Sequence, residues 1–178
     1  MRRTDEAMQA TAGPIHRFLA GDHARLDALL QSAVARADEI DRPAYASFRA
    51  GLLKHIGMEE KILLPAIRRA QDGLPYDRAE RLRLDHGAIA ALLVPTPTST
   101  IVAALRAILT AHNPLEEDSG GLYELADRVL GENADAVLAR LQGAPEVPVA
   151  AHSDGARVME ATRRALARAG YDLGAYER

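Results

Sequence analysis

Apolar side chains recur at steps of three and four residues along four stretches of the chain. These stretches are residues 14–37, 41–71, 76–94 and a fourth that starts after a proline- and threonine-rich turn at 94–99. A spacing of three and four places the apolar residues of each stretch on one face of an amphipathic helix. The pattern therefore predicts four helices whose apolar faces meet in a common core.

Proline and glycine mark where the predicted helices begin, bend and end. Pro14 and Pro43 fit the first turns of the first two helices, whereas Pro65 and Pro114 fall inside helical patterns and predict a kink or an interruption. The run Asp-Ser-Gly-Gly at 118–121 predicts a break. Beyond it the pattern indicates three shorter helices, at residues 122–130, 134–141 and 156–169.

Long helices with short connections are typical of an antiparallel four-helix bundle. We therefore predict an all-α fold with the bundle in residues 1–142 and a linker and C-terminal helical tail in residues 143–178. The tail is rich in arginine and alanine and only weakly amphipathic. Three interpretations of it stay open: a docked helix, a contact with a second copy or a protein partner, and a mobile tail.

The composition narrows the chemistry that such a bundle could support. The chain has no cysteine, which excludes disulfide scaffolds, cysteine-ligated zinc, iron–sulfur clusters and thiol catalysis. Its absence also fits a reducing cytoplasm, where we expect the protein to act. A net charge of −3 argues against a nucleic-acid partner, and no apolar run of about 18 residues is present to span a membrane. Six histidines remain as candidate metal ligands.

Two parts of the chain resemble each other, and the likeness includes histidines. Residues 22–30, D-H-A-R-L-D-A-L-L, align with residues 85–93, D-H-G-A-I-A-A-L-L, with five identical positions of nine. Each segment is followed by a second match, because His55 and His112 both begin the pattern H-x-x-x-E-E. The chain therefore resembles one helical hairpin used twice, with a histidine on its first helix and His-x-x-x-Glu on its second.

The repeated residues predict a dinuclear metal site. Residues at i and i+4 of a helix lie about 40° apart and about 6 Å along its axis, so each His-x-x-x-Glu reaches one part of the core. Buried glutamates need a compensating charge, and no lysine or arginine lies on the inner stripes. Four imidazoles and two carboxylates suit two Fe, Mn or Zn ions bridged by the carboxylates, and do not suit Cu(I). The predicted ligands are His23, His55, Glu59, His86, His112 and Glu116.

This layout resembles the hemerythrin-like, or HHE cation-binding, family over roughly residues 14–131. The matching pieces are His23 in D-H-x-x-L-D-x-L-L, His55-x-x-x-Glu59-Glu60 before Leu63-Leu64-Pro65, the lone His86, and His112-x-x-x-Glu116-Glu117 before Leu122-Tyr123. The resemblance implies a non-haem di-iron site with an oxo or hydroxo bridge. By the same resemblance, His23 and His55 bind one iron, His86 and His112 bind the other, and Glu59 and a glutamate after His112 bridge the two.

The sequence departs from the family's oxygen carriers at two places. Those proteins have a further histidine four residues after the one matched by His86, and this position is Ala90 here. They also place the second bridging carboxylate five residues after the last histidine, which corresponds to Glu117. The internal repeat instead favours Glu116, and we keep Glu117 as the reserve.

These features predict a protein that binds, senses or reduces a small oxidant such as O2, peroxide or nitric oxide. The missing ligand at Ala90 favours reaction or sensing over reversible oxygen carriage. The alternatives are an iron-handling or metal-sensing module without turnover, whose tail reports to a partner, and a plain structural bundle with hydrogen-bonded histidines. No residue is assigned a catalytic role, and whether the protein is an enzyme stays open.

Five other polar residues have less defined roles in the sequence. His16 is interpreted as structural or as lining an entrance. Asp27 is interpreted either as a group that orients a metal ligand or as a surface residue. Glu60 is interpreted as a solvated or supporting group in preference to an extra ligand, and Asp22 and Asp85 as local helix features or functional groups.

Overall fold

The computed structural model describes residues 12–36 and 39–177, and the regular structure in this part of the chain is helical. An isolated β-bridge joins Arg36 to Glu39. The α-helices are α2 (Pro14–Ala33), α3 (Arg42–Met58), α4 (Leu64–Ala70), α5 (Ala79–Leu92), α6 (Ser99–Glu117), α7 (Leu122–Leu130), α8 (Ala134–Gln142) and α9 (Ala156–Arg168). A π-helical turn, Glu59–Leu63, joins α3 to α4, and 3-10 turns lie at Gly131–Asn133 and Leu173–Tyr176.

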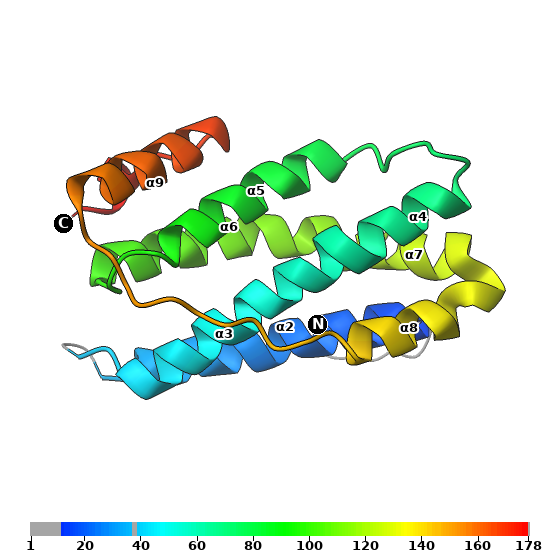
Figure 1. The fold of residues 1–178 in the computed structure, drawn as a ribbon, viewed down its shortest axis with the longest axis horizontal. Helices are drawn as coiled ribbons and strands as arrows, with labels where there is room; N and C mark the ends of the chain where they lie inside the picture. The colour runs from blue at the N-terminus through cyan, green and yellow to red at the C-terminus, as the bar shows by residue number, and fades with distance from the viewer. Residues whose placement is uncertain (1–11, 37–38, 178) are drawn as a thin grey trace.

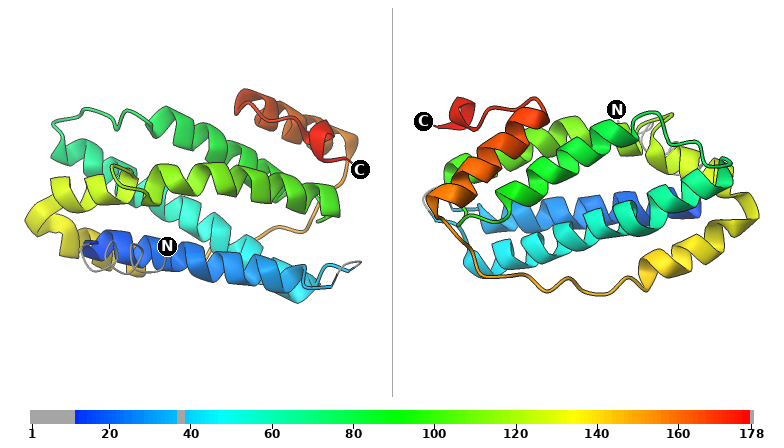
Figure 2. Two further views of the ribbon diagram at one scale, coloured as in Figure 1. Left: turned by 180° about the vertical axis from the view of Figure 1, so that it is seen from behind. Right: turned by 45° about the horizontal axis from the view of Figure 1, so that its top comes forward.

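The long helices form the predicted antiparallel bundle. Figure 1 shows α2 running beside the continuous α3–α4 rod, with α5 and α6 as the opposite antiparallel pair. Helix α7 continues beyond the end of α6, and the chain then turns back into α8, which lies along α2 (Figure 2). Helix α9 packs on the outside of α5, which agrees with a docked helix in the tail. No helix in the described residues has the length and apolar character needed to cross a membrane.

The helix limits differ from the sequence prediction at three places. Helix α2 ends at Ala33 instead of residue 37, which lies outside the described residues, and α5 begins at Ala79 instead of residue 76. The predicted interruption at Pro114 is wrong, because α6 continues through it to Glu117. Pro114 and Thr110 are both exposed, so water can bind the Thr110 carbonyl that lacks an amide partner.

A distant side chain fixes the start of α2. The N-cap residue, Gly13, has no side chain, and the free amides of Ile15 and His16 instead donate to the carboxylate of Asp127 in α7, both at 3.0 Å. A Cβ atom on Gly13 would overlap the Asp127 side chain, at 2.2 Å from its Cγ atom. Glycine at this position therefore lets α7 dock against the beginning of α2.

The apolar core consists of two clusters, one toward each end of the bundle. One cluster includes Leu26, Phe48, Leu52, Ile89 and Ile108. The other includes Leu19, Met58, Leu63, Leu82 and Leu122. Along each long helix a histidine falls between the residues of the first cluster and those of the second. The bundle therefore contains a polar layer between two apolar layers.

Candidate metal centre

Two overlapping groups of ligand atoms occupy this polar layer. One consists of His23, His55, Glu59 and Glu116, and the other of Glu59, His86, His112 and Glu116. Within each group all four ligand atoms lie within 4.8 Å of one another, and all the residues are buried. The structure thus brings the six predicted residues together, with the two glutamates common to both groups.

Each histidine of the layer is held from outside by a carboxylate at its Nδ1 atom. The contacts are His23 to Glu117 (2.5 Å), His55 to Asp22 (2.9 Å), His86 to Glu60 (2.8 Å) and His112 to Asp85 (3.4 Å). A carboxylate only accepts, so Nδ1 must carry the proton. The lone pair of each neutral imidazole is then on Nε2, which faces the centre and is free to bind a metal.

The outer carboxylates follow the internal repeat. Asp22 and Asp85 each precede the first histidine of a hairpin, and each binds the second histidine of the same hairpin. Glu60 and Glu117 each follow a central glutamate, and each binds a histidine of the other hairpin. Consecutive helical residues point about 100° apart, so one glutamate faces the centre while the next reaches the neighbouring helix.

The same geometry separates the roles of the remaining predicted residues. Glu116 is fully buried at the centre, whereas Glu117 is partly exposed and pairs with His23. Asp27 does not orient His23, because it lies on the surface and accepts a hydrogen bond from Gln31. Sequence reasoning gave Asp22, Asp85 and Glu60 no definite role, although their repeated placement beside ligands was a signal for one.

Electrostatic pairing between the imidazoles and the carboxylates stabilises the layer. Burial lowers the pKa of His55, but Glu59 and Asp22 outweigh it and raise that pKa to about 10. In the same way burial opposes, and neighbouring carboxylates produce, a pKa of about 12 for His86 and about 9 for His112. The pKa of Glu59 lies well below its usual value, because the charges of His55 and His86 outweigh its burial. The protons that these groups share balance the negative charge of the carboxylates, which is what a bound metal ion would do.

The two central carboxylates are incompletely paired, which tests whether a cation fits. Glu59 Oε2 and Glu116 Oε1 are buried and accept no hydrogen bond from the described residues. Imidazole Nε2 atoms lie only 3.2 Å from both, from His86 and His112 respectively, without hydrogen-bond alignment. Buried carboxylate oxygens without donors are costly unless they bind a cation. Nitrogen and carboxylate ligands in this arrangement fit borderline-to-hard divalent or trivalent ions.

One further side chain reaches the centre and was not predicted as a site residue. Tyr123, from the first turn of α7, is fully buried and donates its hydroxyl hydrogen to Glu59 Oε1 at 2.6 Å. Burial, together with the charges of Glu116 and Glu59, raises its pKa well above the usual value. Tyr123 belongs to the Leu122-Tyr123 pair that matches the family in the sequence, but the direction of its side chain depends on how α7 docks.

A pocket of about 600 Å³ lies beside the centre between α2, α3 and α6. His23 is part of its wall, and Asp27, Gln31, Thr110 and Asn113 contribute polar side chains to it. His23 retains 8% exposure, the largest value among the six clustered residues. The pocket therefore gives a small molecule an approach to the His23 side of the centre.

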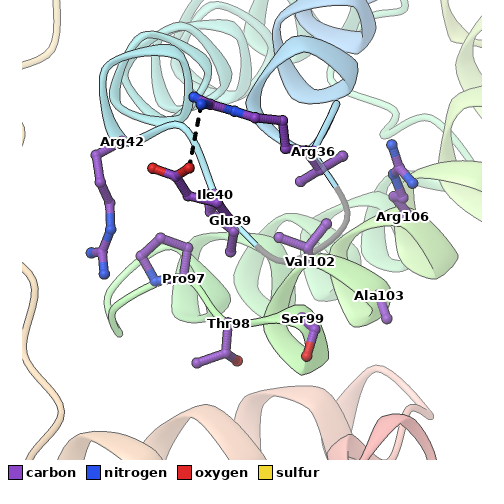
Figure 3. Close-up of a pocket in the computed structure, with 11 residues that line it drawn as sticks. Arg36, Glu39, Ile40, Arg42, Pro97, Thr98, Ser99, Val102, Ala103 and Arg106 are labelled. Carbon is purple, nitrogen blue, oxygen red and sulfur yellow. Dashed lines mark ion pairs between the residues drawn. The ribbon is translucent and has the colours of Figure 1, made fainter.

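A larger pocket lies at the end of the bundle and is separate from the centre. It measures about 860 Å³ and is lined by residues from the connection between α2 and α3, the start of α3, the turn before α6 and the first half of α6 (Figure 3). Arg36, Arg42 and Arg106 are among these residues, and Arg36 pairs with Glu39 at 3.3 Å. None of the six clustered residues lines this pocket.

The comparison with known families agrees with this site. A family model described as the hemerythrin HHE cation-binding domain matches residues 15–120, more than half of the chain. The chain therefore belongs to the hemerythrin HHE cation-binding family. No curated protein and no solved structure matches the chain. Family membership and the two groups of ligands together indicate a metal-binding module.

Proposed function

We propose that the protein is a non-haem di-iron protein that binds, senses or reduces a small oxidant, namely O2, peroxide or nitric oxide. One observation carries the proposal: two groups of buried ligands share Glu59 and Glu116, as a pair of carboxylate-bridged ions would require. His23 and His55 would complete one iron site, and His86 and His112 the other. Mn or Zn would suit the same ligands, and iron is preferred because of the family.

Iron bound here would supply the electrons and the open coordination positions for the oxidant. The chain's own residues do the rest. The four outer carboxylates fix the imidazole rings so that Nε2 faces inward. The apolar clusters on either side keep bulk water from the layer. Glu59, which is fully buried, accepts a hydrogen bond from Tyr123 in the structure, and this contact keeps the tyrosine oxygen beside the centre.

The test is metal content together with the absorption spectrum. Protein purified from iron-replete cells without added metal should contain two irons per chain, and its reduced form should change its visible spectrum with O2, hydrogen peroxide or nitric oxide. Glu59→Gln keeps the shape of the side chain but removes a charge shared by both groups, so both irons should be lost. Asp27→Asn, on the surface beside His23, is the matched control and should keep them.

Absence of metal from the wild-type protein would contradict the proposal. Iron that is bound but gives the same spectrum with all three oxidants would leave the second candidate, an iron-handling or metal-sensing module.

A specific contact favours that candidate. Asp85, which holds His112, also binds Arg81 at 2.8 Å, and Arg81 donates to the Ala169 carbonyl at 3.0 Å and to the Tyr171 hydroxyl at 2.9 Å. The C-terminal segment is thus connected to the candidate ligand His112 through Arg81 and Asp85, by three successive contacts.

The second candidate predicts that iron alters the C-terminal segment through Arg81. Hydrogen exchange of residues 156–177 should change when iron is added to the wild-type protein. The change should disappear in Arg81→Gln and persist in Arg164→Gln, which removes an exposed pair with Glu160 within α9. Identical exchange with and without iron in the wild-type protein would rule out this role.

A further inference from the structure

We infer that Tyr123 is a fifth protein ligand of the metal bound by His23 and His55, so that the two metal sites are unequal. The inference rests on the proposed di-iron function. It concerns a residue beyond the segment matched by the family model, which ends at residue 120. It also goes beyond the six histidines and glutamates that the repeat predicts.

The Tyr123 hydroxyl oxygen lies among the ligand atoms of one group only. It is 2.6 Å from Glu59 Oε1 and 3.4 Å from Glu116 Oε2. It is 3.2 Å from Nε2 of His23 and 3.2 Å from Nε2 of His55. Metal–ligand bonds of about 2.1 Å place neighbouring ligand atoms about 3 Å apart. The hydroxyl oxygen therefore has the spacing of another member of the same coordination shell.

Local structure aims Tyr123 into this position. Residues 118–121 interrupt the helical structure after α6. Gly120 takes a φ of +77°, a conformation that favours glycine. After this break the chain enters α7, which packs against α6, and Tyr123 in the first turn of α7 is fully buried. The ring of His16 packs edge-on against the Tyr123 ring, with centroids 5.9 Å apart, and restricts its rotation. His16 is thus a support for the tyrosine rather than a member of either ligand group.

The internal repeat shows why the second site differs. Tyr123 comes seven residues after Glu116, and the residue seven after Glu59 is Ala66, which cannot bind a metal. Ala90 stands four residues after His86 and likewise offers no ligand. The His86 and His112 site therefore keeps only its two histidines and the two shared glutamates, and has more room for an external ligand.

The ligation is a proton-for-metal exchange without a change of oxidation state. A bond forms between the tyrosine oxygen and the metal, the O–H bond breaks, and the proton passes to solvent. Loading the wild-type protein should therefore release one proton more than loading Tyr123→Phe.

The experiment uses ferrous iron added to metal-free protein under argon, followed by oxidation. Ferric iron bound by tyrosinate gives a visible charge-transfer band and tyrosine ring modes in the resonance Raman spectrum, so both should appear in the wild-type protein. Both should vanish in Tyr123→Phe, which should still bind two irons, with the first bound about tenfold more weakly. Tyr45→Phe is the matched control, because Tyr45 is equally buried but lies in an apolar cluster.

The outcomes separate this inference from the proposed function. Wild-type protein that binds no iron overturns both. Wild-type protein that binds two irons but has the same Raman spectrum and proton release as Tyr123→Phe overturns the tyrosine ligand alone. Loss of the band in Tyr123→Phe with its retention in Tyr45→Phe supports the inference.

Discussion

The contact between each histidine and an outer carboxylate decides which ring nitrogen faces the core. This choice matters because only the unprotonated nitrogen can bind a metal. In the structure the inward nitrogens lie against Glu59 and Glu116, at 3.2 to 3.6 Å. The same side chains therefore either share protons with one another or release them to a metal ion.

This exchange predicts a pH dependence for the metal-free protein. Nearby carboxylates raise the pKa of His112 to about 9 and that of His55 to about 10, above an unfolded value of about 6.5. A raised pKa means that the protonated imidazoles stabilise the fold fully below pH 6.5 and lose this contribution as pH rises through 9 to 10. The melting temperature of chelator-treated protein should therefore fall between pH 8 and pH 10. A flat profile over that interval would contradict the assignment of shared protons.

At the scale of the helix, two local irregularities place the ligands. The π-helical turn at Glu59–Leu63 ends two residues before Pro65, and the amide of the next residue, Leu64, donates to the Glu59 carbonyl. Such turns are rare and often occur at functional sites. The second irregularity is the break at residues 118–121, which directly follows Glu117, the last residue of α6, and connects α6 to α7. Both irregularities adjoin a glutamate pair.

The close packing of the backbone in this break predicts that a side chain at Gly121 destabilises the protein. A Cβ atom there would lie 2.6 Å from the Glu116 carbonyl oxygen and 2.7 Å from that of Asp118. Since backbone atoms cannot move away freely, Gly121→Ala should lower the free energy of unfolding by about 1–3 kcal/mol, as measured by urea denaturation. Gly21→Ala, in α2 with open space around its Cβ position, is the control and should be neutral or stabilising. Equal stability of the two variants would show that the break tolerates a side chain.

At the scale of the whole molecule, the polar layer divides the core into two apolar clusters. Nine buried polar or charged residues are found in the described part of the chain, and six of them are the predicted ligands. Such a layer stabilises a fold less than apolar packing of the same volume, unless a bound ion compensates its charges. The stability of this bundle should consequently depend on its metal.

Removal of metal should therefore lower the melting temperature markedly. Binding at a thousandfold excess over the dissociation constant adds about 4 kcal/mol, and each kcal/mol shifts the melting temperature of a domain this size by about 2–4 °C. Chelation of the iron-loaded protein should thus lower its melting temperature by about 10 °C. Glu59→Gln should melt at the same temperature with and without chelator. An equal shift in that variant would attribute the effect to binding elsewhere.

The sequence by itself determined the helices, their inward faces and the repeat that selects six residues. Periodicity and the spacing of i and i+4 are local properties, so no knowledge of the packing is needed to read them. Local reasoning wrongly predicted an interruption at Pro114. The helix continues there because the Thr110 carbonyl, one turn earlier, is exposed to water. Whether the six residues bind metal stays a prediction.

The tertiary structure alone decided which groups meet across helices. The pairing of Glu117 with His23, the cap that Asp127 gives to α2 and the direction of Tyr123 all join residues about a hundred positions apart. Such contacts depend on how each helix is rotated and shifted against its neighbours, and a rotation of one residue, about 100°, exchanges Glu116 for Glu117 at the centre. Sequence periodicity defines the inward face of a helix, but only packing selects the side chain that reaches a given atom.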